Sequence, residues 1–128
     1  MAGKKVVSTN SAPPAVGPYS QAIRAGNFLF LSGQLPLDLK SGNIIGEDIE
    51  AQTRQVLINI KSVLAAEGLS LYEVVKTTVF LKDIQHFPKM NGIYKEYFSQ
   101  DAPARSTVQV ANLPMNAMVE IECIAIAS

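Results

Sequence analysis

An arginine and two glutamates on the last two predicted strands are the residues best suited to carry chemistry. Arg105 begins a strand directly after Pro103-Ala104, and Glu120 and Glu122 share one face of the final strand. The planar guanidinium of arginine binds carboxylates through paired hydrogen bonds, and a glutamate orients a water molecule or moves a proton. If the two strands are neighbours, Arg105 and Glu120 could form a small polar pocket in an apolar interface.

Plainer roles for these charges stay open. Arg105 could be a surface arginine paired with an acid, because charged side chains are usually solvated. Glu120 and Glu122 could lie on a solvated edge or form ion pairs with Lys76 and Arg105. A carboxylate buried in so apolar a strand would need a partner of this kind.

The composition argues against several other classes of site. His86 is the only histidine and Cys123 the only cysteine, so we expect neither a Ser-His-Asp nor a Cys-His mechanism and no metal site. We expect His86 on the surface near a helix start, and Cys123 as a small buried hydrophobe opposite Glu120. Eleven basic and eleven acidic residues cancel, which argues against a nucleic-acid partner. With no signal core and no membrane-length apolar run, we expect a soluble cytoplasmic protein.

The elements that must position these residues form one predicted α+β domain over residues 1–128. An apolar stripe at helical spacing predicts a helix over 47–67, with acids at its start and Gly68 at its end. A second helix is predicted over 87–98, with Asp83 as its cap. Short apolar or β-branched runs complete the order β-β-β-α-β-α-β-β. The strands after the first are expected from within 19–24 and over 27–33, 74–81, 105–110 and 119–127.

Both faces of the predicted sheet are rich in apolar residues. In the last strand Val119, Ile121 and Cys123 point one way and Ile124 and Ile126 the other. In 74–81 the alternation places Val75, Val79 and Leu81 on one face and Val74 and Phe80 on the other. The whole chain is 48% hydrophobic and only 17% charged. Because two helices cover one face, we expect other subunits to cover the second face.

Several segments, in the right order and covering nearly the whole chain, carry a resemblance to one family. The segment 103–114, PARSTVQVANLP, followed by VEIE at 119–122, looks like the signature of the RidA/YjgF family of reactive-intermediate deaminases. GPYSQA at 17–22 and LSGQ at 31–34 are similar to two further motifs of the family. The segments VVKTTVF at 74–80 and NGIY at 91–94 also match.

The resemblance implies a fold, an assembly and a reaction. The fold would be chorismate-mutase-like, with a mixed sheet of about six strands and two helices on one face. The assembly would be a homotrimer with active sites between subunits. The reaction would be hydrolysis of 2-imino acids, such as 2-iminopropanoate and 2-iminobutanoate, to 2-oxo acids and ammonia. These imines are tautomers of 2-aminoacrylate-type enamines, and no cofactor or metal is implied.

Family roles transfer to matching residues of this sequence. Arg105 would bind the substrate carboxylate, Glu120 would position the attacking water and relay a proton, and the backbone of Gly33 would contact the imine. The resemblance places further residues around the pocket: Tyr19, Ser32, Phe87, Asn91 and Thr107.

Thr107 departs from the family pattern, because many members have cysteine there. Threonine has no thiol, so regulation by oxidation or modification of a cysteine at that position is not expected in this chain. Two other functions stay open: an endoribonuclease or translation inhibitor, and a non-catalytic binder of small 2-oxo acids.

Overall fold

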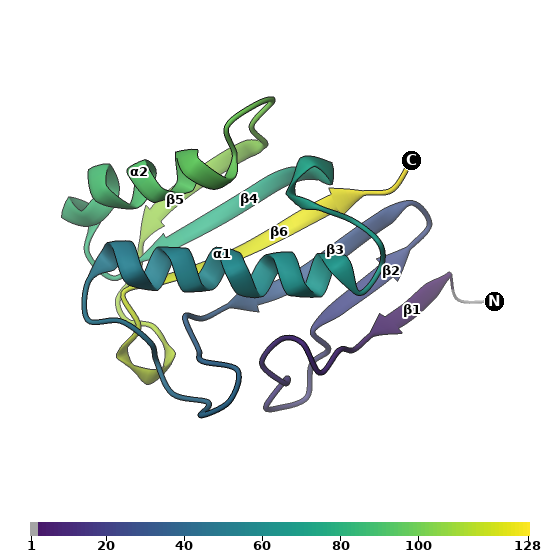
Figure 1. Ribbon diagram of the computed structural model, residues 1–128, viewed down its shortest axis with the longest axis horizontal. Coiled ribbons are helices and arrows are strands. Elements are labelled where there is room, and N and C mark those ends of the chain that lie inside the picture. The colour runs from purple at the N-terminus through teal and green to yellow at the C-terminus, as the bar shows by residue number, and fades with distance from the viewer. Residues whose placement is uncertain (1–2) are drawn as a thin grey trace.

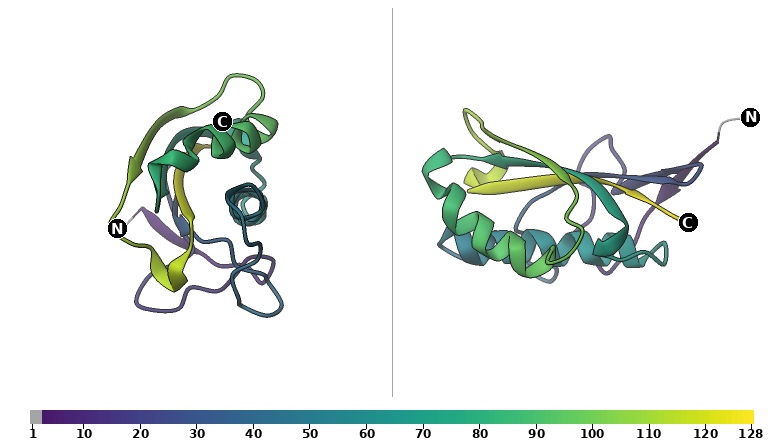
Figure 2. Two further views of the ribbon diagram at one scale, coloured as in Figure 1. Left: turned by 90° about the vertical axis from the view of Figure 1, so that its left-hand side faces the viewer. Right: turned by 90° about the horizontal axis from the view of Figure 1, so that it is seen from above.

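A mixed six-stranded sheet carries two α-helices on one face in the computed structural model, which describes residues 3–128 (Figures 1 and 2). The strand order is β1-β2-β3-β6-β4-β5. Strands β4 and β5 are parallel, and all other neighbouring pairs are antiparallel. The predicted α+β class and element order are confirmed. The elements are β1 (Lys4–Val7), β2 (Ala22–Ala25), β3 (Phe28–Gln34), α1 (Ile49–Ala65), β4 (Val74–Leu81), α2 (Phe87–Tyr97), β5 (Ala104–Gln109) and β6 (Val119–Ile126), with short 3-10 turns at Leu71–Glu73, Ile84–His86 and Pro114–Asn116.

The long helix α1 lies across the sheet and supplies one side of the core (Figure 1). Its N-cap is Asp48, whose side chain accepts a hydrogen bond from the Ala51 N–H at 2.7 Å. Gly68 follows the helix in the left-handed region, at φ 72°, which glycine adopts without strain. The predicted apolar stripe is buried against the sheet, and includes Val56, Leu57, Ile60, Val63 and Leu64.

Helix α2 is the crossover between the parallel strands β4 and β5. Parallel neighbours require such a connection, and here it brings α2 onto the same face as α1 (Figure 2). Asp83 caps the short turn Ile84–His86 by accepting from the Gln85 N–H at 2.9 Å. The prediction that Asp83 caps the second helix is therefore wrong, since α2 itself begins after His86 without a side-chain cap.

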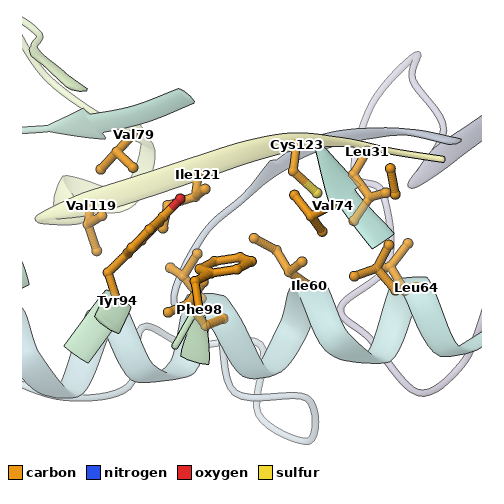
Figure 3. Close-up of a cluster of buried hydrophobic side chains, with 14 of the residues drawn as sticks. Leu31, Ile60, Leu64, Val74, Val79, Tyr94, Phe98, Val119, Ile121 and Cys123 are labelled. Atoms are coloured by element: carbon orange, nitrogen blue, oxygen red, sulfur yellow. The ribbon is translucent and has the colours of Figure 1, made fainter. Parts of the chain in front are cut away.

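The core lies between the helices and the sheet face they cover (Figure 3). Cys123 points from β6 into this layer near Val74 and Ile60 and is 2% exposed. Burial, followed by the charge of Glu122, raises the pKa of the Cys123 thiol to about 12. Cys123 is thus a buried small hydrophobe with little thiolate at neutral pH, as predicted.

The face without helices keeps several large apolar side chains exposed. Phe28 and Phe30 on β3 are each 43% exposed, and Val108 on β5 and Ile126 on β6 are similar. Monomeric proteins rarely leave so many such groups on one sheet face. The apolar excess of the composition therefore lies where strand alternation predicts it.

Strand alternation fails at one point of β4. The register with β6 shifts between Val74 and Lys76, because a bulge there inserts an extra residue. Val74 is therefore buried with Val79 and Leu81, while Val75 is 40% exposed. The predicted faces of Val74 and Val75 were the reverse.

The segment before β2 is an ordered loop fixed by Gln21. The Gln21 side chain is 5% exposed. It accepts from the Thr9 N–H at 2.7 Å and donates to the carbonyls of Thr9 and Pro13 at 3.1 and 2.8 Å. These bonds hold the loop against Gln21, whose backbone carbonyl accepts from the Ser32 N–H of β3 at 3.0 Å. The strand expected within 19–24 begins only at Ala22. No helix within residues 3–128 is long and apolar enough to cross a membrane.

Candidate active site

Arg105 projects from β5 toward the helices. Its register partner on β4 is Thr77, which is fully buried on the helix-covered face. The guanidinium carbon lies 4.7 Å from the ring centre of Tyr94 and 5.3 Å from that of Phe87. Both rings belong to α2 and are seven residues apart, which places them on one helix face. An arginine over two aromatic faces is attracted to both.

A cleft opens beside this arginine, with an approximate volume of 500 Å³. Asn91 lies on the same stripe of α2 as Phe87 and Tyr94, and its Oδ1 is buried without a hydrogen-bond partner among residues 3–128. Thr107 lies two residues after Arg105 on β5, and its Oγ1 is likewise buried without a hydrogen-bond partner among residues 3–128. Buried polar atoms normally have a partner, so both can take one from a ligand, a water molecule or another chain. The cleft is lined by Asn91, Tyr94, Lys95, Phe98, Ala102, Pro103 and Arg105.

Glu120 projects from β6 on the opposite face, where its register partner is Phe80. It packs directly against Gly33 at the register shift of β3. A methyl group at Gly33 would overlap Oε2 of Glu120 and lie 2.9 Å from its Cδ. Ser32 donates its hydroxyl to the Ser20 carbonyl at 2.6 Å, which ties this turn to the N-terminal loop.

Tyr19 lies beside Gly33 in a notch formed by that loop. Tyr19 is half exposed, and its hydroxyl accepts from the Val16 N–H at 3.3 Å. The same notch is lined by Pro13, Pro14, Ala15, Gln21, Gly33, Gln34, Leu35 and Leu37.

The predicted site residues thus fall into two groups. Arg105, Phe87, Asn91 and Thr107 form the arginine half-site, on the helix-covered side of the sheet edge at β5. Glu120, Gly33, Ser32 and Tyr19 form the glutamate half-site, on the other face and toward β3. The suggestion of a pocket between neighbouring strands of one chain is wrong, because β4 separates β5 from β6 and the two charges point away from each other.

The charges of the two half-sites have no ion-pair partner within residues 3–128. The ion pairs there join Lys5 and Arg24 to Glu67, and Arg54 to Glu96. The pairs suggested for Glu120 and Glu122 with Lys76 or Arg105 do not form, and Lys76 instead donates to the Ser106 hydroxyl at 3.2 Å. Burial, and secondarily the charge of Glu122, raises the pKa of Glu120.

Glu120→Gln is expected to raise the melting temperature at pH 7 and to change it little at about pH 3. A raised pKa means that the folded chain holds the Glu120 proton more tightly than the unfolded chain does. As the pH rises from the pKa of Glu120 in the unfolded chain through its higher pKa in the folded chain, the wild type therefore loses stability. The glutamine amide of the variant does not titrate, so the variant loses none at this position. Thermal melts at the two pH values measure the difference.

Glu122→Gln is the matched control, since it removes the same charge from an exposed neighbour on β6. We expect a smaller difference between the two pH values for this variant. A Glu120→Gln protein that is destabilised at pH 7 relative to acid would contradict the prediction.

Two residues near Arg105 are not among the predicted site residues. Tyr94 lies on the predicted helix over 87–98 without a predicted site role, yet its ring contacts the guanidinium. Thr77 bonds the Tyr94 hydroxyl at 2.7 Å. The seven-residue spacing from Phe87 to Tyr94, with the polar Asn91 between them on the stripe, is the signal that could have indicated this contact. His86 directly precedes α2, as expected. It is half-buried rather than a surface residue, and its Nδ1 is buried without a partner among the described residues.

Comparisons with known proteins identify the family of the chain. A family model described as Endoribonuclease L-PSP matches residues 9–127. The chain is 56% identical over 122 residues to a RutC family protein of Pyrococcus horikoshii, covering 95% of this chain and 97% of that one. It is 54% identical over 122 residues to the chloroplastic Reactive Intermediate Deaminase A of Arabidopsis thaliana, covering 95% of this chain and 65% of that one. It is 41% identical over 126 residues to the 2-iminobutanoate/2-iminopropanoate deaminase of Dermatophagoides farinae, covering 98% of each.

Solved structures show the same fold. The YjgF gene product of E. coli superimposes with a TM-score of 0.92 at 42% identity, covering 97% of this chain and 99% of that one. E. coli TdcF with bound serine gives a TM-score of 0.92 at 41% identity, with the same coverage. The sequence motifs, the mixed sheet with its two helices and these similarities together show that the chain belongs to the RidA/YjgF family.

Proposed function

We propose that this protein hydrolyses 2-imino acids, such as 2-iminopropanoate and 2-iminobutanoate, to 2-oxo acids and ammonia. The observation that carries the proposal is a pair of charges without an ion-pair partner among residues 3–128, a guanidinium held over two aromatic rings and a carboxylate packed against Gly33. Two relatives are named as deaminases, one of them for these two imines. A third relative, E. coli TdcF, has a solved structure with bound serine, which carries a carboxylate as the 2-imino acids do.

The reaction needs positioning and one proton relay. Arg105 binds the substrate carboxylate by paired hydrogen bonds, which presents the C=N carbon to a water molecule. Glu120 takes a proton from that water as its oxygen bonds to the carbon, and the imine nitrogen becomes an amine. Glu120 then gives the proton to the amine; as the C–N bond breaks, the hydroxyl of the intermediate becomes the carbonyl and its proton passes through Glu120 to the leaving ammonia, so the products are a 2-oxo acid and ammonium. A protonated imine is already electrophilic, so these residues require no cofactor.

The active site in this proposal forms between two copies of the chain in a homotrimer. Within one chain the arginine and glutamate half-sites lie on opposite faces of the sheet and cannot contact one small substrate together. The exposed apolar side chains of the helix-free face, including Phe28 and Phe30, supply a surface for association. A second copy would bring its arginine half-site against the glutamate half-site of the first.

Mixing two inactive variants tests the activity and the shared site together. Arg105→Met and Glu120→Gln trimers are unfolded, combined in equal amounts and refolded, and ammonia release is measured with imine made in place by a serine or threonine dehydratase. Random assembly pairs an intact Arg105 with an intact Glu120 in about one quarter of the sites, so about one quarter of wild-type activity should return.

The outcomes of this experiment separate the two parts of the proposal. A wild type that releases no ammonia above the dehydratase alone would overturn the deaminase function. An active wild type whose mixed variants form trimers by light scattering but stay inactive would overturn the shared site. Binding of 2-oxobutanoate without turnover would instead identify a carboxylate-binding protein.

An endoribonuclease activity is suggested by the description of the family model. The cleft offers Arg105 and Lys95 as its cations, and the chain has a net charge of zero. A general RNA-binding surface is more basic than this, so the geometry favours the deaminase. If the purified protein cleaves RNA and the Arg105→Met variant does not, the endoribonuclease would be favoured over the deaminase.

A further inference from the structure

We propose that Tyr94, held in place by Thr77, is a positioning residue that sets the orientation of the Arg105 guanidinium; this rests on the proposed function. The three side chains form a closed arrangement. Thr77 and Arg105 are register partners on β4 and β5, and Tyr94 reaches both from α2. Its ring lies 4.7 Å from the guanidinium carbon, and its hydroxyl lies 2.7 Å from the Thr77 Oγ1.

The hydrogen bond is unusual for its surroundings. The other residues of β4 that face the helices are apolar, namely Val74, Val79 and Leu81, and Thr77 is fully buried among them. The hydroxyl of Tyr94 points from α2 into this layer (Figure 3). A phenylalanine and a valine would fill the same space without any polar atom. A satisfied polar pair in an apolar layer fixes one geometry, whereas apolar packing alone tolerates several.

The geometry that this bond fixes is the depth and tilt of the Tyr94 ring. Phe98 packs against that ring, with centroids 4.6 Å apart. The ring is therefore held from the sheet by Thr77 and from the helix by Phe98, and Arg105 lies over it. Phe87 completes the support at 5.3 Å from the guanidinium carbon. An arginine held in this way loses less freedom when it binds a carboxylate.

The expected consequence is an effect on substrate binding rather than on the chemical step. Tyr94→Leu should raise KM for the imino acid about 5- to 30-fold, the range expected for a partly desolvated cation–π contact. The kcat should fall less than threefold, because Glu120 and its water lie outside the arrangement. Tyr94→Phe keeps the ring but removes its bond to the buried Thr77 hydroxyl, so its KM should rise, though by less than that of Tyr94→Leu.

Nuclear magnetic resonance reports the position of Arg105 without any need for activity. The chain has three arginines, Arg24, Arg54 and Arg105, so their side-chain N–H signals can be assigned by substitution. A ring beneath the guanidinium shifts the Arg105 signal, and Tyr94→Leu should remove that shift. The matched control is Arg54, which lies 5.9 Å from the ring centre of Tyr97. Tyr97→Leu should move the Arg54 signal only and leave KM unchanged.

The role of Thr77 is tested by removing one or both partners of the hydrogen bond. Thr77→Val leaves the Tyr94 hydroxyl buried without a partner and should raise KM several-fold. Adding Tyr94→Phe removes the stranded hydroxyl and should restore part of the affinity, because losing both partners costs less than losing one, although the bond no longer fixes the ring. A Thr77→Val defect that Tyr94→Phe does not rescue would overturn the positioning role.

These readouts also separate the inference from the proposed function. If the wild type does not deaminate, the Arg105 signal and the affinity for 2-oxobutanoate, measured by calorimetry, still test the arrangement. If Tyr94→Leu leaves both the signal and the carboxylate affinity unchanged, the inference is wrong whatever the activity of the protein.

Discussion

Arg105→Met is expected to lower kcat/KM for 2-imino acids roughly 100- to 1,000-fold, the loss expected when one partner of a desolvated charge pair is removed. The guanidinium is the only side-chain cation placed over the aromatic rings of the cleft by the described residues. Methionine keeps much of the packing against Phe87 and Tyr94 but provides no donor. Arg105 has no ion-pair partner within residues 3–128, so its removal leaves no acidic side chain unpaired. The melting temperature should therefore change little.

The matched control for this prediction is Arg54→Met. Arg54 also lies over a ring of α2, that of Tyr97, but it pairs with Glu96 on the outer surface of the helices at 3.0 Å. It should keep full activity. Arg105→Lys should recover only part of the lost activity, because an ammonium restores the charge but not the paired donors. An Arg105→Met trimer that deaminates at the wild-type rate would refute the assignment of the carboxylate site.

Much of the fold follows from local patterns in the sequence. The stripe of α1 and the apolar runs of β3 and β6 each bury one face, and the period of that burial identifies the element. The alternation in β4 was misread because a bulge at Val74 shifts the faces. Bulges depend on the pairing of strands distant in the chain, which the sequence of one strand does not contain.

The candidate site shows the same division between local and distant information. Alternation correctly groups Arg105 with Thr107 and places Glu120 opposite Cys123, because these relations lie within single strands. It does not show that β4 separates β5 from β6, since that order depends on the whole sheet. The contact of Tyr94 with Arg105 was missed for a similar reason, as it joins a helix to a strand across the core.

Gly33→Ala is expected to lower kcat/KM about 100-fold, the effect of misplacing a catalytic group by about 1 Å. Gly33 does not have the left-handed φ of Gly46, so alanine fits its backbone conformation. The new methyl group would overlap the Glu120 carboxylate rather than any backbone atom. A flexible side chain moves more easily than the sheet, so we expect the carboxylate to shift while the melting temperature and the assembly are retained.

Gly46→Ala supplies the opposite result for comparison. Its φ is +91°, and a methyl group there would lie 2.7 Å from the Ala51 Cβ and 3.3 Å from backbone atoms of α1. This substitution should destabilise the chain, yet the molecules that remain folded should keep their activity. The two glycines thus separate a loss of catalysis from a loss of folding.

The clash at Gly33 can be relieved by shortening its neighbour. Glu120→Asp withdraws the carboxylate by one methylene group, so alone it should lower activity by moving the carboxylate away from its water. In the Gly33→Ala background the same change makes room for the methyl group and should raise activity above that of Gly33→Ala alone. This reversal of sign is expected only if the two side chains compete for one space. Additive losses in the double variant would show that Gly33 does not set the position of Glu120.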